Sequence, residues 1–171
     1  NLTNKYINLI NVNYENKTVK RKSFNSGNIF IKKSFDIAFK IIRSGLSDKF
    51  INGPINKSIF LNRKFLGMTE YISNAFNAKK TAMLIYNKEL SVCPVTTHLP
   101  LKLVSKKINK KIIREKVKII NDFYLNNLGF KPKIAVTGLN PHCESILKFN
   151  EDEKIISVAI KSLKKANYKI N

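Results

Sequence analysis

The stretch NKKIIREKVKIINDFYLNNLGFKPKIAVTGLNPH, residues 109–142, decides the fold. Asn109 can cap a helix and Gly129 can end it, and between them the apolar residues recur with a period of 3.6. These apolar residues are Ile112, Ile113, Val117, Ile120, Phe123, Tyr124 and Leu128. Residues 133–137 then form a short apolar run, typical of a buried strand, that leads into a proline-containing loop ending at His142. The stretch therefore predicts a helix, a strand and a polar loop at the strand's end.

The rest of the chain repeats this alternation. We expect strands at residues 29–31, 49–52, 81–86 and 90–95, and short strands with Asn-rich turns over residues 2–19. We expect further helices at residues 34–46, 71–76 and 150–166, beginning at the caps Ser34, Thr69 and Asn150. In the first of these, the apolar residues at helical spacing are Phe35, Ala38, Phe39, Ile42 and Leu46, and we expect its aromatic residues to lie in the core. Alternating strands and helices predict an α/β fold with a largely parallel sheet.

Composition limits the class of protein. The chain has 171 residues, 43% of them hydrophobic, and contains two cysteines. It has no apolar run long enough to span a bilayer and no signal peptide, so we expect a cytoplasmic protein without a membrane partner. Because it begins without Met and ends abruptly, we also expect a fragment of a longer protein. The net charge of +21 permits a nucleic-acid partner, but the lysines are spread over every segment and no nucleic-acid-binding motif is present, so we do not favour one.

The two histidines, His98 and His142, are the first candidates for chemistry. Each follows a predicted strand, and ligands of α/β proteins bind beyond the carboxyl ends of strands. Neutral imidazole is a common ligand of transition metals. Three alternatives stay open: two unrelated loop histidines, a structural zinc site that includes Cys93 and Cys143, and a nucleophilic pair of Cys143 with His142.

Four blocks of sequence, in order, resemble the 4-hydroxythreonine-4-phosphate dehydrogenase family of vitamin B6 biosynthesis. They are GPINK (53–57), GMTEY (67–71), TTHLPL (96–101) and GLNPH (138–142). Any one block is weak, whereas four in the same order and spacing are specific. The resemblance covers nearly the whole chain and matches roughly the middle half of a family member. It implies that residues 1–171 are a single partial α/β region of a two-lobed dehydrogenase that lacks both ends.

The resemblance implies a fold like that of isocitrate and isopropylmalate dehydrogenases, an αβα sandwich, in a homodimer with active sites at the interface. It implies NAD- or NADP-dependent oxidation of 4-(phosphooxy)-L-threonine, followed by decarboxylation to 3-amino-2-oxopropyl phosphate on the route to pyridoxal 5'-phosphate. A divalent metal (zinc, magnesium or cobalt) is held by three histidines, of which His98 and His142 are two; the third is expected beyond Asn171. Met68 and Thr69 carry over as substrate-binding positions. The resemblance assigns no catalytic base and no cofactor-binding residue.

Two departures from the family pattern bear on the substrate. Met68 stands where the family has histidine, and a thioether cannot replace an imidazole hydrogen bond. After His142 the family has a glycine-rich acidic loop, whereas this chain reads CESIL, in which Glu144 can keep the acidic role. The alternatives are therefore a related dehydrogenase of another phosphorylated hydroxy acid or of a dihydrodiol, an inactive family member, or, from another class, a basic nucleic-acid-binding module.

Overall fold

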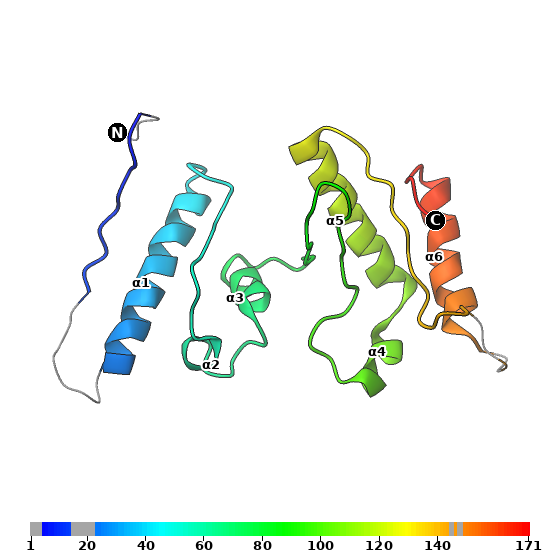
Figure 1. Cartoon of the computed structure of the whole chain (residues 1–171), viewed down its shortest axis with the longest axis horizontal. Coiled ribbons are helices and arrows are strands. Elements are labelled where there is room, and N and C mark those ends of the chain that lie inside the picture. Colours follow the sequence, from blue (N-terminus) through cyan, green and yellow to red (C-terminus); the bar gives the residue numbers. More distant parts are fainter. Residues whose placement is uncertain (1–4, 15–22, 144–145, 147–148) are drawn as a thin grey trace. The chain divides into compact units, whose positions relative to one another are not determined.

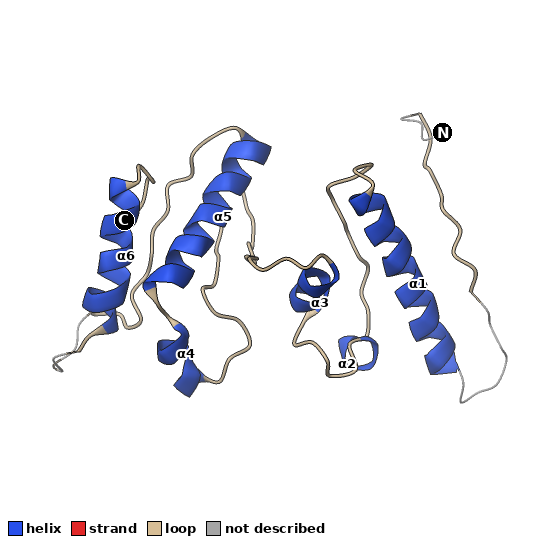
Figure 2. Ribbon diagram, turned by 180° about the vertical axis from the view of Figure 1, so that it is seen from behind, coloured by secondary structure: helices blue, strands red, loops and turns tan. Residues whose placement is uncertain are grey.

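The computed structural model describes residues 5–14, 23–143, 146 and 149–171. It divides into two compact units, Asn1–Phe76 and Asn77–Asn171, which are described separately below. The helices of the described residues are α1 (Ser23–Arg43), α2 (Lys57–Phe60), α3 (Met68–Ala75), α4 (Leu101–Lys107), α5 (Lys110–Leu128), the π-helical segment η1 (Asp152–Ser157) and α6 (Val158–Lys165) (Figures 1 and 2). Within the residues that the structure describes, no helix is both long and apolar enough to cross a membrane.

An aromatic cluster forms the core of the first unit. Phe35 and Phe39, four positions apart on one face of α1, are 4% and 3% exposed. They pack against rings from α2, α3 and the flanking loops: Phe50, Phe60, Tyr71 and Phe76. Most of these pairs meet edge to face, the arrangement that aromatic quadrupoles favour. Phe35 and Phe39 are thus confirmed as core, whereas Leu46, predicted as part of the same helix, lies beyond its end at Arg43 and is 64% exposed.

Helix α1 begins at Ser23, eleven residues before the predicted cap at Ser34. Residues 29–31, predicted as a strand, lie inside the helix. The Ser34 hydroxyl does not cap; it donates to the carbonyl of Phe30, one turn earlier, at 2.9 Å. The middle and last turns of α1, from Phe30 to Ile41, line a hollow of about 380 Å³ together with residues 9–12. The extended segment of residues 5–14 runs alongside α1 (Figure 1).

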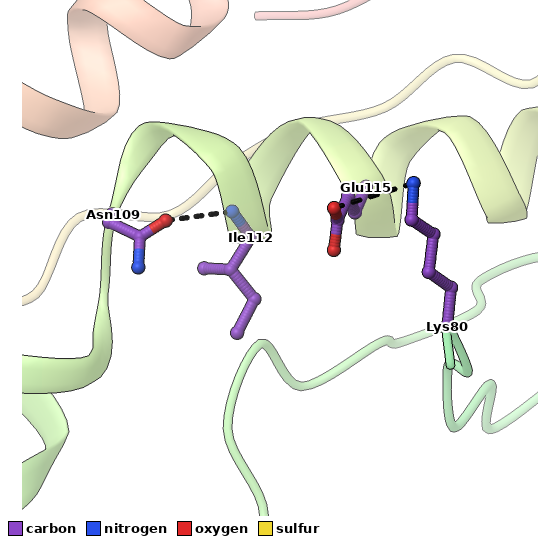
Figure 3. Close-up of polar contacts among 4 residues, drawn as sticks. All are labelled: Lys80, Asn109, Ile112 and Glu115. Atoms are coloured by element: carbon purple, nitrogen blue, oxygen red, sulfur yellow. Dashed lines mark hydrogen bonds and ion pairs between the residues drawn. The ribbon is translucent and has the colours of Figure 1, made fainter. Parts of the chain in front are cut away.

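Helix α5 organises the second unit. It begins as predicted at Asn109, whose side-chain oxygen accepts a hydrogen bond from Ile112 N at 3.0 Å (Figure 3), and it ends at Gly129 with a left-handed φ of 77°. Its inner face packs against η1 and α6. The core of this unit consists of Ile108, Ile113, Val117, Ile156, Ala159, Leu163 and Ile170.

The predicted strands of the second unit are extended segments rather than continuous strands. Residues 81–86 and 90–95 meet at one antiparallel bridge, Ile85 to Val92. Residues 133–137 meet the end of the chain at one parallel bridge, Ile134 to Ile170. A strand needs a continuous ladder of hydrogen bonds, and within the described residues these segments pair at single points. The strand predicted at 49–52 is extended without a bridge, and so are residues 5–14 of the predicted 2–19 strands.

The last helix begins where Asn150 predicts. Asn150 Oδ1 accepts hydrogen bonds from Asp152 N at 2.8 Å and Glu153 N at 3.4 Å. The first six residues form η1, and α6 then continues to Lys165, with Ala166 as the C-cap. The predicted extent of this helix is confirmed, although its π-helical first half was not expected.

Candidate functional site

Residues 81–86 and 90–95 form the two arms of a hairpin that leads to His98. Side chains of α5 hold this hairpin against the helix. The Lys116 ammonium donates a hydrogen bond to the carbonyl of Thr81 at 2.6 Å, on the first arm. The Tyr124 hydroxyl donates to Ser91 Oγ at 2.9 Å, on the second arm. An ion pair of 3.5 Å between Lys80 and Glu115 adds a contact at the base of the hairpin (Figure 3). Helix α5 thus fixes both arms before the chain reaches the His98 loop.

His98 sits in a strained and open backbone position. Its φ is +55°, in the left-handed region that non-glycine residues seldom adopt, and its side chain is exposed. Such a conformation costs about 1–3 kcal/mol and persists where the surroundings hold it. Two residues later Pro100 begins α4, and its carbonyl accepts a hydrogen bond from Leu103 N at 2.8 Å. The loop therefore presents an imidazole to solvent between two fixed elements, the hairpin and α4.

His142 lies in a second loop of the same unit, organised by Asn140. The Asn140 side-chain oxygen accepts a hydrogen bond from His142 N at 2.9 Å, and its carbonyl accepts one from Cys143 N at 3.1 Å. Cys143 has a φ of +55°, which closes the turn. The His142 side chain is exposed. Like His98, it is an imidazole offered to solvent by a constrained loop that follows an extended segment.

The buried carboxylate of Asp152 binds the loop that carries His142. Asp152 is 6% exposed, and its Oδ1 accepts a hydrogen bond from Leu139 N at 3.0 Å. Gly138 lies so close that a Cβ there would overlap Cys143 Sγ and stand 2.9 Å from Asp152 Oδ1. Asp152 was not among the predicted site residues, and Gly138 was predicted only as the first residue of the block GLNPH (138–142). A glycine directly after a predicted strand, followed by an acid at the next helix start, was the available signal.

Met68 and Thr69 lie in the first unit, at the start of α3. Both are half-buried. The prediction that Thr69 caps this helix is wrong: the N-cap is Gly67, in an extended conformation without a side-chain cap, and Thr69 is already helical. The Thr69 carbonyl accepts a hydrogen bond from the Ser73 hydroxyl at 2.6 Å. The next residue, Glu70, buries its Oε2 without a hydrogen-bond partner among the described residues.

The half-buried tyrosine of α3 belongs to the aromatic cluster of the first unit. Tyr71 packs against rings of the aromatic cluster, and burial raises the pKa of its hydroxyl. The nearby carboxylate of Asp36 raises the pKa further, because a negative charge disfavours a second one. Tyr71 therefore keeps its proton at neutral pH, and we see it as part of the core.

The two cysteines differ in environment. Cys93 is half-buried and its Sγ lies 3.8 Å from the carbonyl oxygen of Pro94; burial raises the pKa of its thiol, which the Lys116 ammonium partly opposes. A raised thiol pKa disfavours the thiolate that nucleophilic catalysis requires. Cys143 is exposed, and its Sγ lies 3.7 Å from the carbonyl oxygen of Asn140.

The donor set fits part of a metal centre. Two exposed imidazoles suit zinc or cobalt better than magnesium, which prefers oxygen ligands. Within the described residues no three His, Cys, Asp or Glu side chains gather closely enough to hold an ion, so any complete site needs a further ligand. Glu144, the predicted acidic residue of the following loop, lies outside the described residues.

Comparisons with known proteins agree on one family. The sequence model of the pyridoxal phosphate biosynthetic protein PdxA matches residues 2–171. A 4-hydroxythreonine-4-phosphate dehydrogenase from Sulfurihydrogenibium sp. is 37% identical over 137 residues, which cover 78% of this chain and 42% of that protein. The enzyme of the same name from Aquifex aeolicus is 32% identical over 167 residues, which cover 95% of this chain and 51% of that protein. The chain thus spans about half the length of the curated relatives it matches, or less.

Solved structures give the same fold. The crystal structure of a 4-hydroxythreonine-4-phosphate dehydrogenase from Klebsiella pneumoniae matches 88% of this chain and 46% of its own, with a TM-score of 0.70 and 23% identity. One from Burkholderia phymatum matches 86% of this chain and 45% of its own, with a TM-score of 0.65 and 24% identity. At this level of identity the likeness establishes the fold alone.

Proposed function

The chain belongs to the family of the pyridoxal phosphate biosynthetic protein PdxA, and we propose from that premise that the whole protein is a dehydrogenase of 4-(phosphooxy)-L-threonine. The match over residues 2–171 is the observation that carries the proposal. In this reaction the secondary alcohol transfers a hydride to NAD or NADP and releases a proton. The resulting β-keto acid loses CO2 and takes up a proton, which yields 3-amino-2-oxopropyl phosphate.

His98 and His142 would hold a divalent metal, with zinc or cobalt favoured over magnesium by their nitrogen donors. The ion would supply Lewis acidity that stabilises negative charge on the substrate oxygen. What supports this assignment is that both imidazoles are exposed, belong to one unit and occupy loops that their neighbours constrain. A third ligand beyond Asn171 would complete the site.

The start of α3 would bind the substrate. The Thr69 hydroxyl can donate or accept a hydrogen bond, whereas the thioether of Met68 offers only apolar contact and weak acceptance. Glu70 Oε2, buried without a partner among the described residues, adds an acceptor that a ligand donor would satisfy. The amino group of 4-(phosphooxy)-L-threonine is a donor of that kind.

The remaining features of the proposal concern the assembled protein. We propose an αβα sandwich like that of isocitrate and isopropylmalate dehydrogenases, a homodimer with the active site at the subunit interface, and a cytoplasmic location. Each of these three features is proposed from family membership. They concern the whole protein, whereas this chain spans about half the length of its relatives or less.

The test is NADH formation by the full-length protein with 4-(phosphooxy)-L-threonine, NAD and zinc or cobalt. We expect turnover that a chelator abolishes and added metal restores. Turnover of another phosphorylated hydroxy acid or of a dihydrodiol, but not of this substrate, would reassign the substrate. Absence of turnover with every substrate, in a dimer with bound metal, would identify an inactive family member. Salt-sensitive binding of nucleic acid in place of turnover would instead support the basic-module alternative.

A further inference from the structure

We propose that Asp152 is a positioning residue, whose buried carboxylate holds residues 138–143 in the conformation that presents His142. The affinity of His142 for its metal then depends on a side chain that never touches the ion. The inference rests on the proposed function, because it assumes that His142 binds a metal ion.

The first step of the argument is the rigidity of Asp152 itself. Its backbone N–H is held by Asn150 Oδ1 at 2.8 Å, and its side chain is 6% exposed. It opens η1, whose Ile156 is part of the core of the second unit. The carboxylate is therefore attached to the packed body of the unit and not to a free surface.

The second step is the short path from this carboxylate to His142. Asp152 Oδ1 accepts the Leu139 N–H at 3.0 Å. The next residue, Asn140, accepts the His142 N–H at 2.9 Å on its side chain. Two consecutive residues thus connect the core to the backbone of the proposed ligand. A hydrogen bond with a charged acceptor is shorter and stronger than a neutral one, which suits a fixed support.

The third step is the tight fit around Gly138, the first residue of the loop. A Cβ at Gly138 would overlap Cys143 Sγ and press on Asp152 Oδ1. Residue 138 therefore packs against Cys143, at the other end of the loop, and against Asp152, so a side chain there would require these neighbours to shift. Outer-shell groups that hydrogen-bond a metal ligand change metal affinity by about 10–100-fold when they are removed, and we expect this support through the backbone to act in the same range.

The experiment is a cobalt(II) titration of the full-length protein, followed by the visible absorption of the bound ion and by calorimetry. We expect Asp152→Ala to weaken cobalt binding about 10–100-fold. Asp152→Asn keeps an oxygen that can accept the Leu139 N–H, so we expect it to retain near wild-type affinity. Asn109→Ala is the matched control, because it removes the N-cap of α5 in the same unit and leaves the bond between Asp152 and Leu139. We expect it to lower Tm without changing the cobalt affinity.

Equal cobalt affinity of Asp152→Ala and the wild-type protein would overturn the inference. So would equal losses of cobalt affinity in Asn109→Ala and Asp152→Ala, which would indicate an effect of the unit's stability alone. If Asp152→Ala fails to fold, Asp152→Ser, whose hydroxyl is too short to reach Leu139 N, takes its place with the same expectation. His142→Ala separates the two claims: if it binds cobalt like the wild type, the metal assignment of the proposed function fails. If it loses cobalt while Asp152→Ala does not, only the positioning role fails.

Discussion

Asp152 and Leu139 are 13 positions apart in the sequence, yet the carboxylate of the first accepts a 3.0 Å hydrogen bond from the backbone of the second. This bond ties the start of the last helix to the loop that carries His142. The proposed metal ligand is thereby held by the core of its own unit.

Gly138→Ala should destabilise the second unit. The added methyl overlaps Cys143 Sγ and approaches Asp152 Oδ1 to 2.9 Å, and overpacking of this kind costs about 1–3 kcal/mol. Thermal or urea unfolding measures the loss. Gly27→Ala is the matched control: it lies within α1 with nothing within 4 Å of its Cβ, so it should stabilise by about 0.5–1 kcal/mol. Equal effects of the two substitutions would contradict the tight fit at Gly138.

Tyr124→Phe should loosen the hairpin that leads to His98. It removes the hydroxyl that bonds Ser91 Oγ at 2.9 Å, a loss of about 0.5–1.5 kcal/mol in the free energy of unfolding. Ser91 Oγ also accepts a hydrogen bond from Asn87 N at 3.2 Å and donates one to the Asn87 carbonyl at 3.0 Å, so Ser91→Ala alone should cost more than Tyr124→Phe. In a double-mutant cycle, the combined loss should fall short of the sum of the two single losses by about 0.5–1.5 kcal/mol. Full additivity of the two losses would show that these side chains do not interact.

Cys93 should react with iodoacetamide only at high pH. Burial raises the pKa of its thiol, so its thiolate forms at a higher pH than that of an ordinary cysteine. The rate of alkylation against pH, in a variant in which Cys143 and any cysteine outside residues 1–171 are replaced by serine, measures this pKa. Lys116→Met should raise it further, because the ammonium of Lys116 favours the thiolate. A pKa at or below the ordinary value would contradict the burial seen here.

The same shift predicts how stability changes with pH. Between the unfolded and the folded thiol pKa, the folded protein retains a proton that the unfolded chain has lost. The contribution of Cys93 to the free energy of unfolding is therefore constant below the unfolded pKa and falls as the pH rises above it. Urea unfolding of Cys143→Ser across this alkaline range checks the sign. The fall should be absent when Cys93 is also replaced by alanine.

Met68→His should raise kcat/KM for 4-(phosphooxy)-L-threonine. An imidazole hydrogen bond to a charged substrate group is worth about 1.5–3 kcal/mol, which corresponds to roughly 10–100-fold. Steady-state kinetics of the full-length enzyme measures the gain, and Met68→Leu, an apolar replacement of similar size, should leave the value unchanged. A loss of activity in Met68→His would indicate a substrate that the methionine selects.

The sequence predicted those elements whose signals are local. Helix α5 begins at Asn109 and ends at Gly129 because a side-chain cap and a left-handed glycine act within one turn. The start of α1 was missed because a serine such as Ser34 can either cap a helix or bond the carbonyl one turn earlier inside a helix, and the local pattern does not distinguish the two. The strands were overpredicted because apolar runs report burial, whereas a strand also requires a paired neighbour.

The candidate site, too, could be predicted from the sequence only where the signals are local. The histidine positions follow from the chain, since both loops come after apolar runs. The support by Asp152 joins residues 13 positions apart, and no local pattern encodes such a contact. Thr69 was misplaced as a cap because the extended Gly67, which has no side chain to signal it, takes that role.

The most direct test of the central claim is NADH formation from 4-(phosphooxy)-L-threonine by the full-length wild-type protein, His98→Ala and His142→Ala, each with added zinc or cobalt. The account predicts metal-dependent turnover by the wild type and none by either variant, with circular dichroism and Tm unchanged because both side chains are exposed. Full turnover by both variants would contradict it.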